Sequence, residues 1–193
     1  MNFLFSGSWD KQVRAIDLKL NEVDRAFVAS RECINVVHLF DKWLFVAGMD
    51  PLIRQFDLTS GEAKEFQGHE SWVLCMTHHT TMNSEGEPRF TRLFSGSDDQ
   101  TIRVWDIKNG ICLNVLYGHK CAVLSLGFID GRLYSGSQYH RVIVWSLADV
   151  EQQGFERQTM AAEDLRSKKF EAFEAYMESK GKRKKAPAKK KKK

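Results

Sequence analysis

No apolar run in the sequence approaches the roughly 18 residues of a membrane-spanning helix, so the sequence predicts no transmembrane segment and no membrane partner. Residues 1–10 contain Trp9 and Asp10 and lack a long apolar core, so we expect no secretory signal peptide. The cysteines form no Cys-x-x-Cys pair, which argues against a zinc site. We expect reduced thiols, buried in strands, at Cys33, Cys75, Cys112 and Cys121.

Acidic residues are missing from Lys180 to Lys193, a stretch with 10 Lys and Arg side chains. The rest of the chain carries 19 basic and 25 acidic side chains, so the formal net charge of +4 hides a mildly acidic body. A run of like charges cannot bury itself, so residues 181–193 are expected to be a disordered Lys-rich tail.

Such basic runs are typical of nuclear localisation signals or nucleic-acid patches, and a purely solubilising tail is a third interpretation. No aromatic residue follows Tyr176, so any RNA contact would be electrostatic and non-specific. The expected location is therefore the nucleus, including the nucleolus, or the cytoplasm. The residues concerned are Lys182, Arg183, Lys184, Lys185, Lys189, Lys190, Lys191, Lys192 and Lys193.

The chain repeats itself with a period near 40 residues. Similar segments, of the kind Leu93-Phe94-Ser95-Gly96-Ser97, contain glycines that lie 41, 48 and 40 residues apart, at Gly7, Gly48, Gly96 and Gly136. An alternating segment rich in β-branched and aromatic residues follows each glycine, which predicts a strand. Several short strands in a unit of this length indicate propeller blades.

Turn signals separate the expected strands. Hairpin-turn dipeptides occur at Ser60-Gly61, Asn109-Gly110 and Asp130-Gly131. The longer 48-residue spacing is explained by an insert from Thr80 to Arg89, which we interpret as a surface loop. His78 and His79 precede this insert, but adjacent residues of a strand point to opposite faces, so a metal site there is not expected.

The segment from Gly68-His69 to Trp105-Asp106 resembles a WD40 repeat, and Gly118-His119 to Trp145-Ser146 resembles a second one. Two earlier units are degenerate, with Phe56 and Ile16 at the Trp position. The resemblance implies an all-β fold: a partial WD40 β-propeller of about three and a half four-stranded blades over residues 1–150. A helix over residues 155–180 and the tail would follow.

The resemblance also implies a hydrogen-bonded tetrad that links the strands of a blade. In the third blade these residues would be His69, Ser95, Asp99 and Trp105. In the fourth blade the set is incomplete, because Tyr139 replaces the Asp beside His119, Ser135 and Trp145. A hydrolytic Ser-His-Asp site is disfavoured, because the Ser lies within a strand and parts of the set recur at the repeat period.

The first expected strand corresponds to the second strand of a blade, so the ring is expected to be incomplete. A longer parent chain would supply the missing blades, or a partner would complete a split propeller. In the C-terminal segment Phe170, Phe173 and Met177 share one helix face. That helix either packs on the propeller or docks a partner.

Exposed aromatic residues in turns are typical anchors for binding proteins. The candidates are Trp9, Trp72, Tyr139 and the neighbouring His140, each of which could instead pack against an adjacent blade. We therefore expect a non-catalytic scaffold without cofactor or metal, in a nuclear or RNA-associated assembly. The alternative is a substrate receptor of a cullin-type ubiquitin ligase, because Trp105-Asp106-Ile107-Lys108 resembles the Trp-Asp-x-Arg element of such receptors, apart from Lys108.

Overall fold

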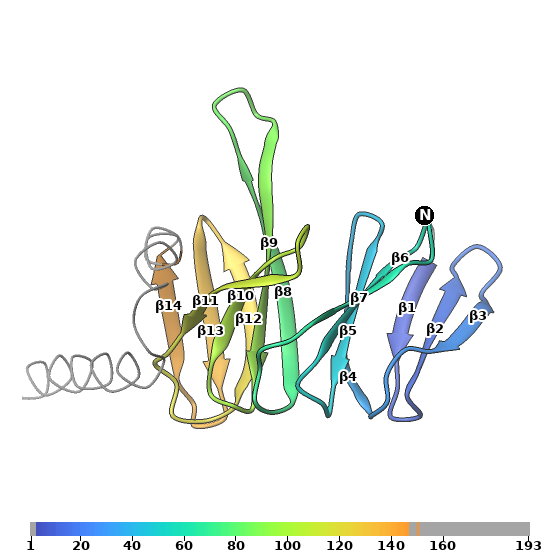
Figure 1. Cartoon of the computed structure of the whole chain (residues 1–193), viewed down its shortest axis with the longest axis horizontal. Helices are drawn as coiled ribbons and strands as arrows, with labels where there is room; N and C mark the ends of the chain where they lie inside the picture. Colours follow the sequence, from blue (N-terminus) through green and yellow to red (C-terminus); the bar gives the residue numbers. More distant parts are fainter. Residues whose placement is uncertain (1–2, 147–149, 151–193) are drawn as a thin grey trace, which may run out of the picture. The chain divides into compact units, whose positions relative to one another are not determined.

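The computed structural model describes residues 3–146 and residue 150, and these residues form four antiparallel sheets (Figure 1). Sheet A contains β1 (Phe3–Gly7), β2 (Gln12–Asp17) and β3 (Glu22–Val28). Sheet B contains β4 (Ile34–Phe40), β5 (Trp43–Gly48), β6 (Ile53–Asp57) and β7 (Ala63–Phe66). Sheet C contains β8 (Val73–Met82), β9 (Pro88–Ser97), β10 (Ile102–Asp106) and β11 (Ile111–Leu116). Sheet D contains β12 (Val123–Ile129), β13 (Arg132–Ser137) and β14 (Val142–Ser146).

Each sheet is a meander in which consecutive strands pair, and the expected all-β fold is confirmed. Sheets B and C have four strands, whereas sheets A and D have three within the described residues. In sheet A, β1 pairs Gly7 with Val13, as the second strand of sheet C pairs Gly96 with Ile102. β1 therefore holds the second-strand position of its unit, as its sequence predicts.

Neighbouring sheets pack face to face and bury three apolar layers. The A–B layer includes Val13 and Leu44, the B–C layer includes Ile53 and Trp105, and the C–D layer includes Ile102, among others. The strand β5 of sheet B is buried on both faces, which explains its nearly continuous apolar sequence. In β10, alternate side chains enter the B–C and C–D layers.

The three predicted hairpin dipeptides form tight turns. Gly61, Gly110 and Gly131 have φ angles of +77°, +72° and +71°, in the left-handed region that glycine occupies without strain. Asp130 has φ of +48°, so the two-residue turn between β12 and β13 has positive φ at both positions, as in a type I′ hairpin.

The insert from Thr80 to Arg89 is not a loop, which corrects the sequence interpretation. Half of it extends β8 and β9, and the other half forms the turn of a long hairpin that projects past the other strands (Figure 1). The Thr80 and Thr91 hydroxyls hydrogen-bond across the pair at 2.9 Å, and the Asn83 side chain accepts backbone N–H bonds in the turn. β-branched threonine suits a strand although it is polar, and polarity suggested a loop.

The described cysteines are free thiols, but the expectation that all are buried in strands is wrong. Cys75 is buried in β8, where burial raises its pKa to about 12, and Cys112 is half-buried in β11. Cys33 and Cys121 lie half-buried in connections between sheets.

The chain divides into two compact units, residues 1–157 and 158–193. The helix expected over residues 155–180 and the tail expected over 181–193 lie outside the described residues. Within the part of the chain that the structure describes, no helix is long and apolar enough to cross a membrane.

Candidate functional site: the connection end of the sheets

Every sheet is a meander, so one turn of each sheet lies at the same end as the connections between sheets. These turns are β1–β2, β5–β6, β9–β10 and β13–β14. This connection end comprises residues 8–11, 29–33, 49–52, 67–72, 98–101, 117–122 and 138–141. It lies at the bottom of Figure 1, whereas the long β8–β9 hairpin projects from the opposite end, here called the hairpin end.

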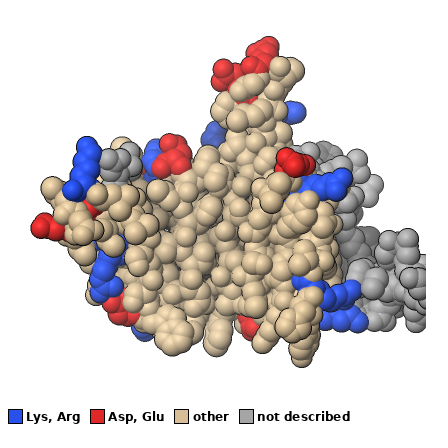
Figure 2. Space-filling model, turned by 180° about the vertical axis from the view of Figure 1, so that it is seen from behind, with Lys and Arg blue, Asp and Glu red and all other residues tan. Residues whose placement is uncertain are grey.

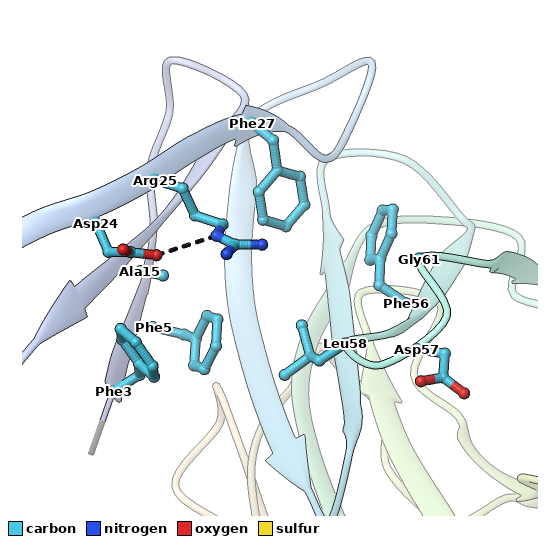
Figure 3. Close-up of a pocket in the computed structure, with 10 residues that line it drawn as sticks. All are labelled: Phe3, Phe5, Ala15, Asp24, Arg25, Phe27, Phe56, Asp57, Leu58 and Gly61. Carbon is cyan, nitrogen blue, oxygen red and sulfur yellow. Dashed lines mark hydrogen bonds and ion pairs between the residues drawn. The ribbon is translucent and has the colours of Figure 1, made fainter. Parts of the chain in front are cut away.

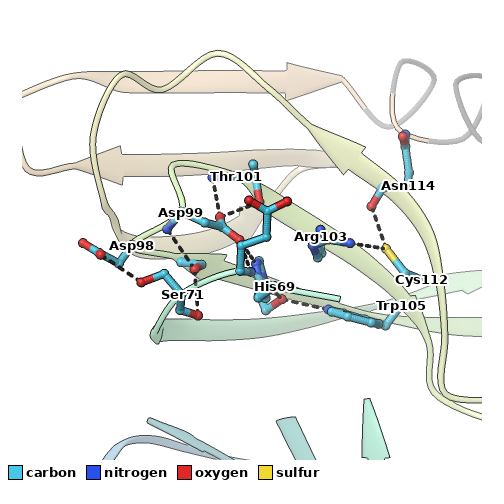
Figure 4. A network of polar contacts seen from close by, with 12 residues as sticks. His69, Ser71, Asp98, Asp99, Thr101, Arg103, Trp105, Cys112 and Asn114 are labelled. Carbon is cyan, nitrogen blue, oxygen red and sulfur yellow. Dashed lines mark hydrogen bonds and ion pairs between the residues drawn. The ribbon is translucent and has the colours of Figure 1, made fainter. Parts of the chain in front are cut away.

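A hydrogen-bonded network fastens the connection end of sheet C (Figure 4). His69 Nδ1 lies 2.7 Å from Asp99 Oδ2, and His69 Nε2 lies 2.7 Å from Ser95 Oγ. The indole N–H of Trp105 donates to Ser95 Oγ at 2.7 Å. A carboxylate can only accept, so Nδ1–H of the neutral His69 ring donates to Asp99, and Nε2, which carries no proton, accepts the hydroxyl proton of Ser95. The network links the connection before β8 to the turn between β9 and β10, through Asp99, and to the strands β9 and β10, through Ser95 and Trp105.

The protonation state of this network follows from its surroundings. Burial lowers the pKa of His69 below its ordinary value, although the Asp99 carboxylate opposes the shift. Asp99 accepts further hydrogen bonds from the hydroxyl and backbone N–H of Thr101 at 2.6 and 2.9 Å. Ser95 is fully buried, and its hydroxyl hydrogen-bonds to His69 and Trp105. The Ser-His-Asp set therefore holds the strands together and offers no nucleophile to a substrate.

Sheet D contains the same network with one partner missing. His119 Nε2 lies 2.6 Å from Ser135 Oγ, and the Trp145 indole donates to that oxygen at 2.8 Å. Among the described residues, buried Nδ1 of His119 has no hydrogen-bond partner, because Tyr139 at the Asp position points into solvent and is 69% exposed. Burial, followed by the charge of Arg141, lowers the pKa of His119 to about 4.

Sheet B has a different network that sequence reasoning missed. Arg54 is buried, and its guanidinium lies 2.8 Å from Asp50 and 3.3 Å from Glu65, while Nη1 donates to Ser30 Oγ at 3.3 Å. Asp50 is the counterpart of Asp99, and Ser30 stands where sheet C has His69. A sequence signal existed, because the Asp-x-x-x-Arg spacing occurs in each of the first three units.

Sheet A follows the sheet B pattern. Its turn residue Asp10 accepts a hydrogen bond of 2.6 Å from Arg14, and this bond is the main cause of its lowered pKa. The turn aspartate therefore binds histidine where a histidine is present, and otherwise binds the arginine four residues later. Both arrangements hold the turn at the connection end in a fixed geometry.

The four predicted partner-binding residues lie at the connection end, and all are exposed. Trp9, Trp72 and Tyr139 are 69%, 47% and 69% exposed, so none of these rings is buried against a neighbouring sheet. His140 is exposed as well and has φ of +55°. It holds the same turn position as Gln100, with φ of +70°, which gives it a role in the turn.

The Trp105–Lys108 segment reaches the hairpin end. Asp106 accepts hydrogen bonds from the backbone N–H of Lys108 at 3.0 Å and from the Asn109 side chain at 2.8 Å, so it caps the turn between β10 and β11. Lys108 is exposed beside a pocket of about 390 Å³, whose lining includes Trp43 and Arg92.

A second pocket, of about 370 Å³, lies between sheets A and B (Figure 3). Its walls are mainly phenylalanine rings, and Phe27 and Phe56 meet edge to face with centroids 5.5 Å apart. Phe56 holds the position of the larger Trp105, which leaves this layer less filled. The charged lining residues Asp24 and Arg25 form an ion pair with each other at 3.1 Å.

The adjacent histidines of β8 point to opposite sides of sheet C, as expected. His78 Nδ1 lies 2.8 Å from His38 Nε2 of sheet B, whereas His79 stacks on Phe128 of sheet D with centroids 4.1 Å apart. Among the described residues, no group of three or more His, Cys, Asp or Glu side chains could hold a metal ion.

The family description "WD domain, G-beta repeat" matches residues 61–106 and 110–146, which are the two units with the His-Ser-Trp contacts. The chain belongs to the WD40-repeat family. The WD40 β-propeller domain of Doa1 shares the fold, with a TM-score of 0.63 at 22% identity over 75% of this chain and 47% of that one. The four sheets are thus blades of a partial WD40 β-propeller.

Curated relatives are similar over part of the chain. An uncharacterised WD repeat-containing protein of Schizosaccharomyces pombe is 31% identical over 54% of this chain and 28% of its own length. The ribosome biogenesis protein YTM1 of Kluyveromyces lactis is 23% identical over 61% and 27%. The F-box/WD repeat-containing protein sel-10 of Caenorhabditis elegans is 36% identical over 40% and 12%. This WD40 chain thus spans less than a third of each of these relatives.

Proposed function

We propose that this WD40 chain is a non-catalytic scaffold that binds other proteins at the connection end of its blades. The observation that carries the proposal is the exposure of Trp9, Trp72 and Tyr139 at one end of three different sheets. Large aromatic side chains lose little conformational entropy on binding and dominate the affinity of protein interfaces. The segments that hold Trp9 and Trp72 are fixed by the networks of Asp10 and Asp99, so this part of the binding surface is preorganised.

We further propose that the scaffold works in a nuclear or RNA-associated assembly. The basic tail supports this, because a lysine-rich run suits nuclear import or electrostatic contact with phosphates. The similarity to the ribosome biogenesis protein YTM1 points the same way. The blades give less support for RNA binding, because the face in Figure 2 shows scattered Lys and Arg side chains and no continuous basic patch.

Removal of Lys180–Lys193 tests this assembly. We expect the truncated protein to lose nuclear enrichment and salt-sensitive RNA cross-linking, while its protein partners remain bound. A matched control replaces the tail lysines with arginine, which keeps the charge and should keep both properties. Unchanged localisation and unchanged RNA cross-linking after the deletion would refute the nuclear and RNA part of the proposal.

The alternative function is that of a substrate receptor of a cullin-type ubiquitin ligase. It would use the hairpin end, where Lys108 is exposed next to the pocket lined by Trp43 and Arg92. The similarity to an F-box/WD repeat-containing protein supports it. Lys108→Glu changes this surface without touching the turn cap of Asp106. Loss of a cullin adaptor from the purified complex in this variant, with tail-dependent localisation intact, would favour the alternative.

A further inference from the structure

The third-strand position of the four blades is held by β2, β6, β10 and β14. Equivalent side chains of these strands are buried in sheets A, B and C but exposed in sheet D. Val13, Ile53 and Ile102 are each 0% exposed, whereas their counterpart Val142 in sheet D is 70% exposed. Two residues further on, Ala15, Gln55 and Val104 are 3%, 2% and 2% exposed, and Val144 is 49% exposed. We call the surface around Val142 and Val144 the D face.

The second-strand position is held by β1, β5, β9 and β13. Here the equivalent side chains are buried in sheets B, C and D but exposed in sheet A. Leu44, Leu93 and Leu133 are each 0% exposed, whereas their counterpart Leu4 in sheet A is 52% exposed. Near it Leu18 is 58% exposed, although its counterpart in sheet C, Ile107, is only 6% exposed. We call the surface around Leu4 and Leu18 the A face.

The two surfaces are the two halves of one kind of contact. Val13 and Leu44 pack in the A–B layer, Ile53 and Leu93 in the B–C layer, and Ile102 and Leu133 in the C–D layer. In each described layer, a third-strand residue of one sheet therefore meets the second-strand leucine of the next. By this rule the partner of Val142 is a leucine placed as Leu4 is.

The glycines of the second strands agree with this reading. A Cβ atom on Gly96 would lie 2.6 Å from Val123 Cγ1 of the next sheet, and one on Gly7 would lie 2.5 Å from Ile34 Cγ2 of the next sheet. A Cβ atom on Gly136 would come near only Ser125 of its own sheet. The D face thus keeps the close-approach glycine, which no described neighbour uses.

We propose that the D face of one copy of this chain binds the A face of a second copy, head to tail. A second copy is the occupant that the chain itself supplies, because it carries both complementary surfaces and each contact would repeat the three existing layers. Two copies bring eight sheets together, which lies within the range of closed propellers of roughly four to eight blades. Heterologous contacts of this kind form a ring when the rotation closes.

This inference goes beyond the proposed scaffold function and uses different surfaces. The A and D faces are flanks of the terminal sheets, whereas Trp9, Trp72 and Tyr139 lie at the connection end. Loss of the second copy would therefore leave the aromatic residues in place, and loss of protein partners through the aromatic residues would leave the pairing intact. The two proposals fail separately.

Light scattering of the 193-residue chain in solution tests the pairing. We expect a mass of twice the 22.2 kDa of one chain, and a single mass that does not grow with concentration. Leu4→Lys and Val142→Glu should each weaken pairing by at least about 30-fold, the loss typical of a central apolar contact. Ile111→Lys is the matched control, since Ile111 is 58% exposed on the outer strand of an interior sheet and should keep the double mass.

Mixing the two variants distinguishes head-to-tail pairing from pairing of like faces. The Leu4→Lys chain keeps an intact D face and the Val142→Glu chain keeps an intact A face, so we expect the mixture to regain pairs that neither forms alone. Circular dichroism verifies that both variants are folded. A monomeric wild-type chain, an open-ended series of masses, or a Leu4→Lys chain that still pairs with itself would each overturn the proposal.

Discussion

The carboxylate of Asp50 lies 2.8 Å from the guanidinium of Arg54, at the position where the next blade joins its aspartate to a histidine. The same turn is therefore fixed by an ion pair in one blade and by a buried His-Ser-Trp network in another. Both solutions satisfy a buried polar side chain with partners that the blade itself provides. Predictions about stability follow from which of these partners is present.

Replacing Asp99 with alanine removes the partner of His69 Nδ1 and leaves a buried donor without an acceptor. We expect a loss of about 1–3 kcal/mol in the free energy of unfolding, measured by urea denaturation. Asp98→Ala is the matched control, because the neighbouring carboxylate is exposed and accepts a hydrogen bond from the half-buried Ser71 hydroxyl. Its effect should stay within about 0.5 kcal/mol, and equal losses in both variants would contradict the role of the network.

Replacing Tyr139 with aspartate supplies the partner that His119 Nδ1 lacks. We expect a gain of about 0.5–1.5 kcal/mol, the usual net value of a hydrogen bond in a folded protein. In a His119→Gln background the gain should disappear, which a double-mutant cycle measures. An equal gain in both backgrounds would show that the new carboxylate acts elsewhere.

The stability of the fold should fall as the pH is lowered from about 6.5 to about 4. Burial, and then the charge of Arg141, lowers the pKa of His119 to about 4, and burial together with His78 does the same for His38. Between these values the unfolded chain binds protons that the folded chain does not, so acid favours unfolding and stability is full above the ordinary pKa of 6.5. Thermal melting across this range should be flatter in His38→Gln/His119→Gln; an unchanged slope would exclude these rings as the cause.

The contact between sheets C and D depends on the absence of a side chain at Gly96. An added methyl group would meet Cys75 Sγ and Val123 Cγ1, both at 2.6 Å, so Gly96→Ala should cost about 1–3 kcal/mol. Gly127→Ala is the control, because a Cβ atom there meets nothing within 4 Å. Comparable melting temperatures for the two variants would show that the sheets approach less closely.

The repeat period, the hairpin dipeptides and the WD40 resemblance were sufficient to predict blades and the second and third strands of each unit. They worked because alternation and turn residues are local properties of the chain. The partner of Asp50 was not predicted, because the Asp-x-x-x-Arg spacing also occurs at Asp99, which binds histidine, so the spacing alone does not show which partner the aspartate takes. The long β8–β9 hairpin was mistaken for a loop because Thr80 and its neighbours are polar. The exposure of Val142 could not be read from its sequence segment, which is as apolar as its buried counterparts.

The central claim is that this WD40 chain binds proteins through the aromatic residues of its connection end. The most direct test is quantitative co-purification from cells with wild-type protein, with Trp9→Ala/Trp72→Ala/Tyr139→Ala and with a control that truncates three other exposed apolar side chains, Leu20→Ala/Met82→Ala/Ile129→Ala. These control residues are 70%, 56% and 61% exposed and lie in turns or strand ends away from the connection end. We predict that the aromatic variant loses the specific partners while it remains folded and the control retains them. Retention of the same partners by the aromatic variant would contradict the claim.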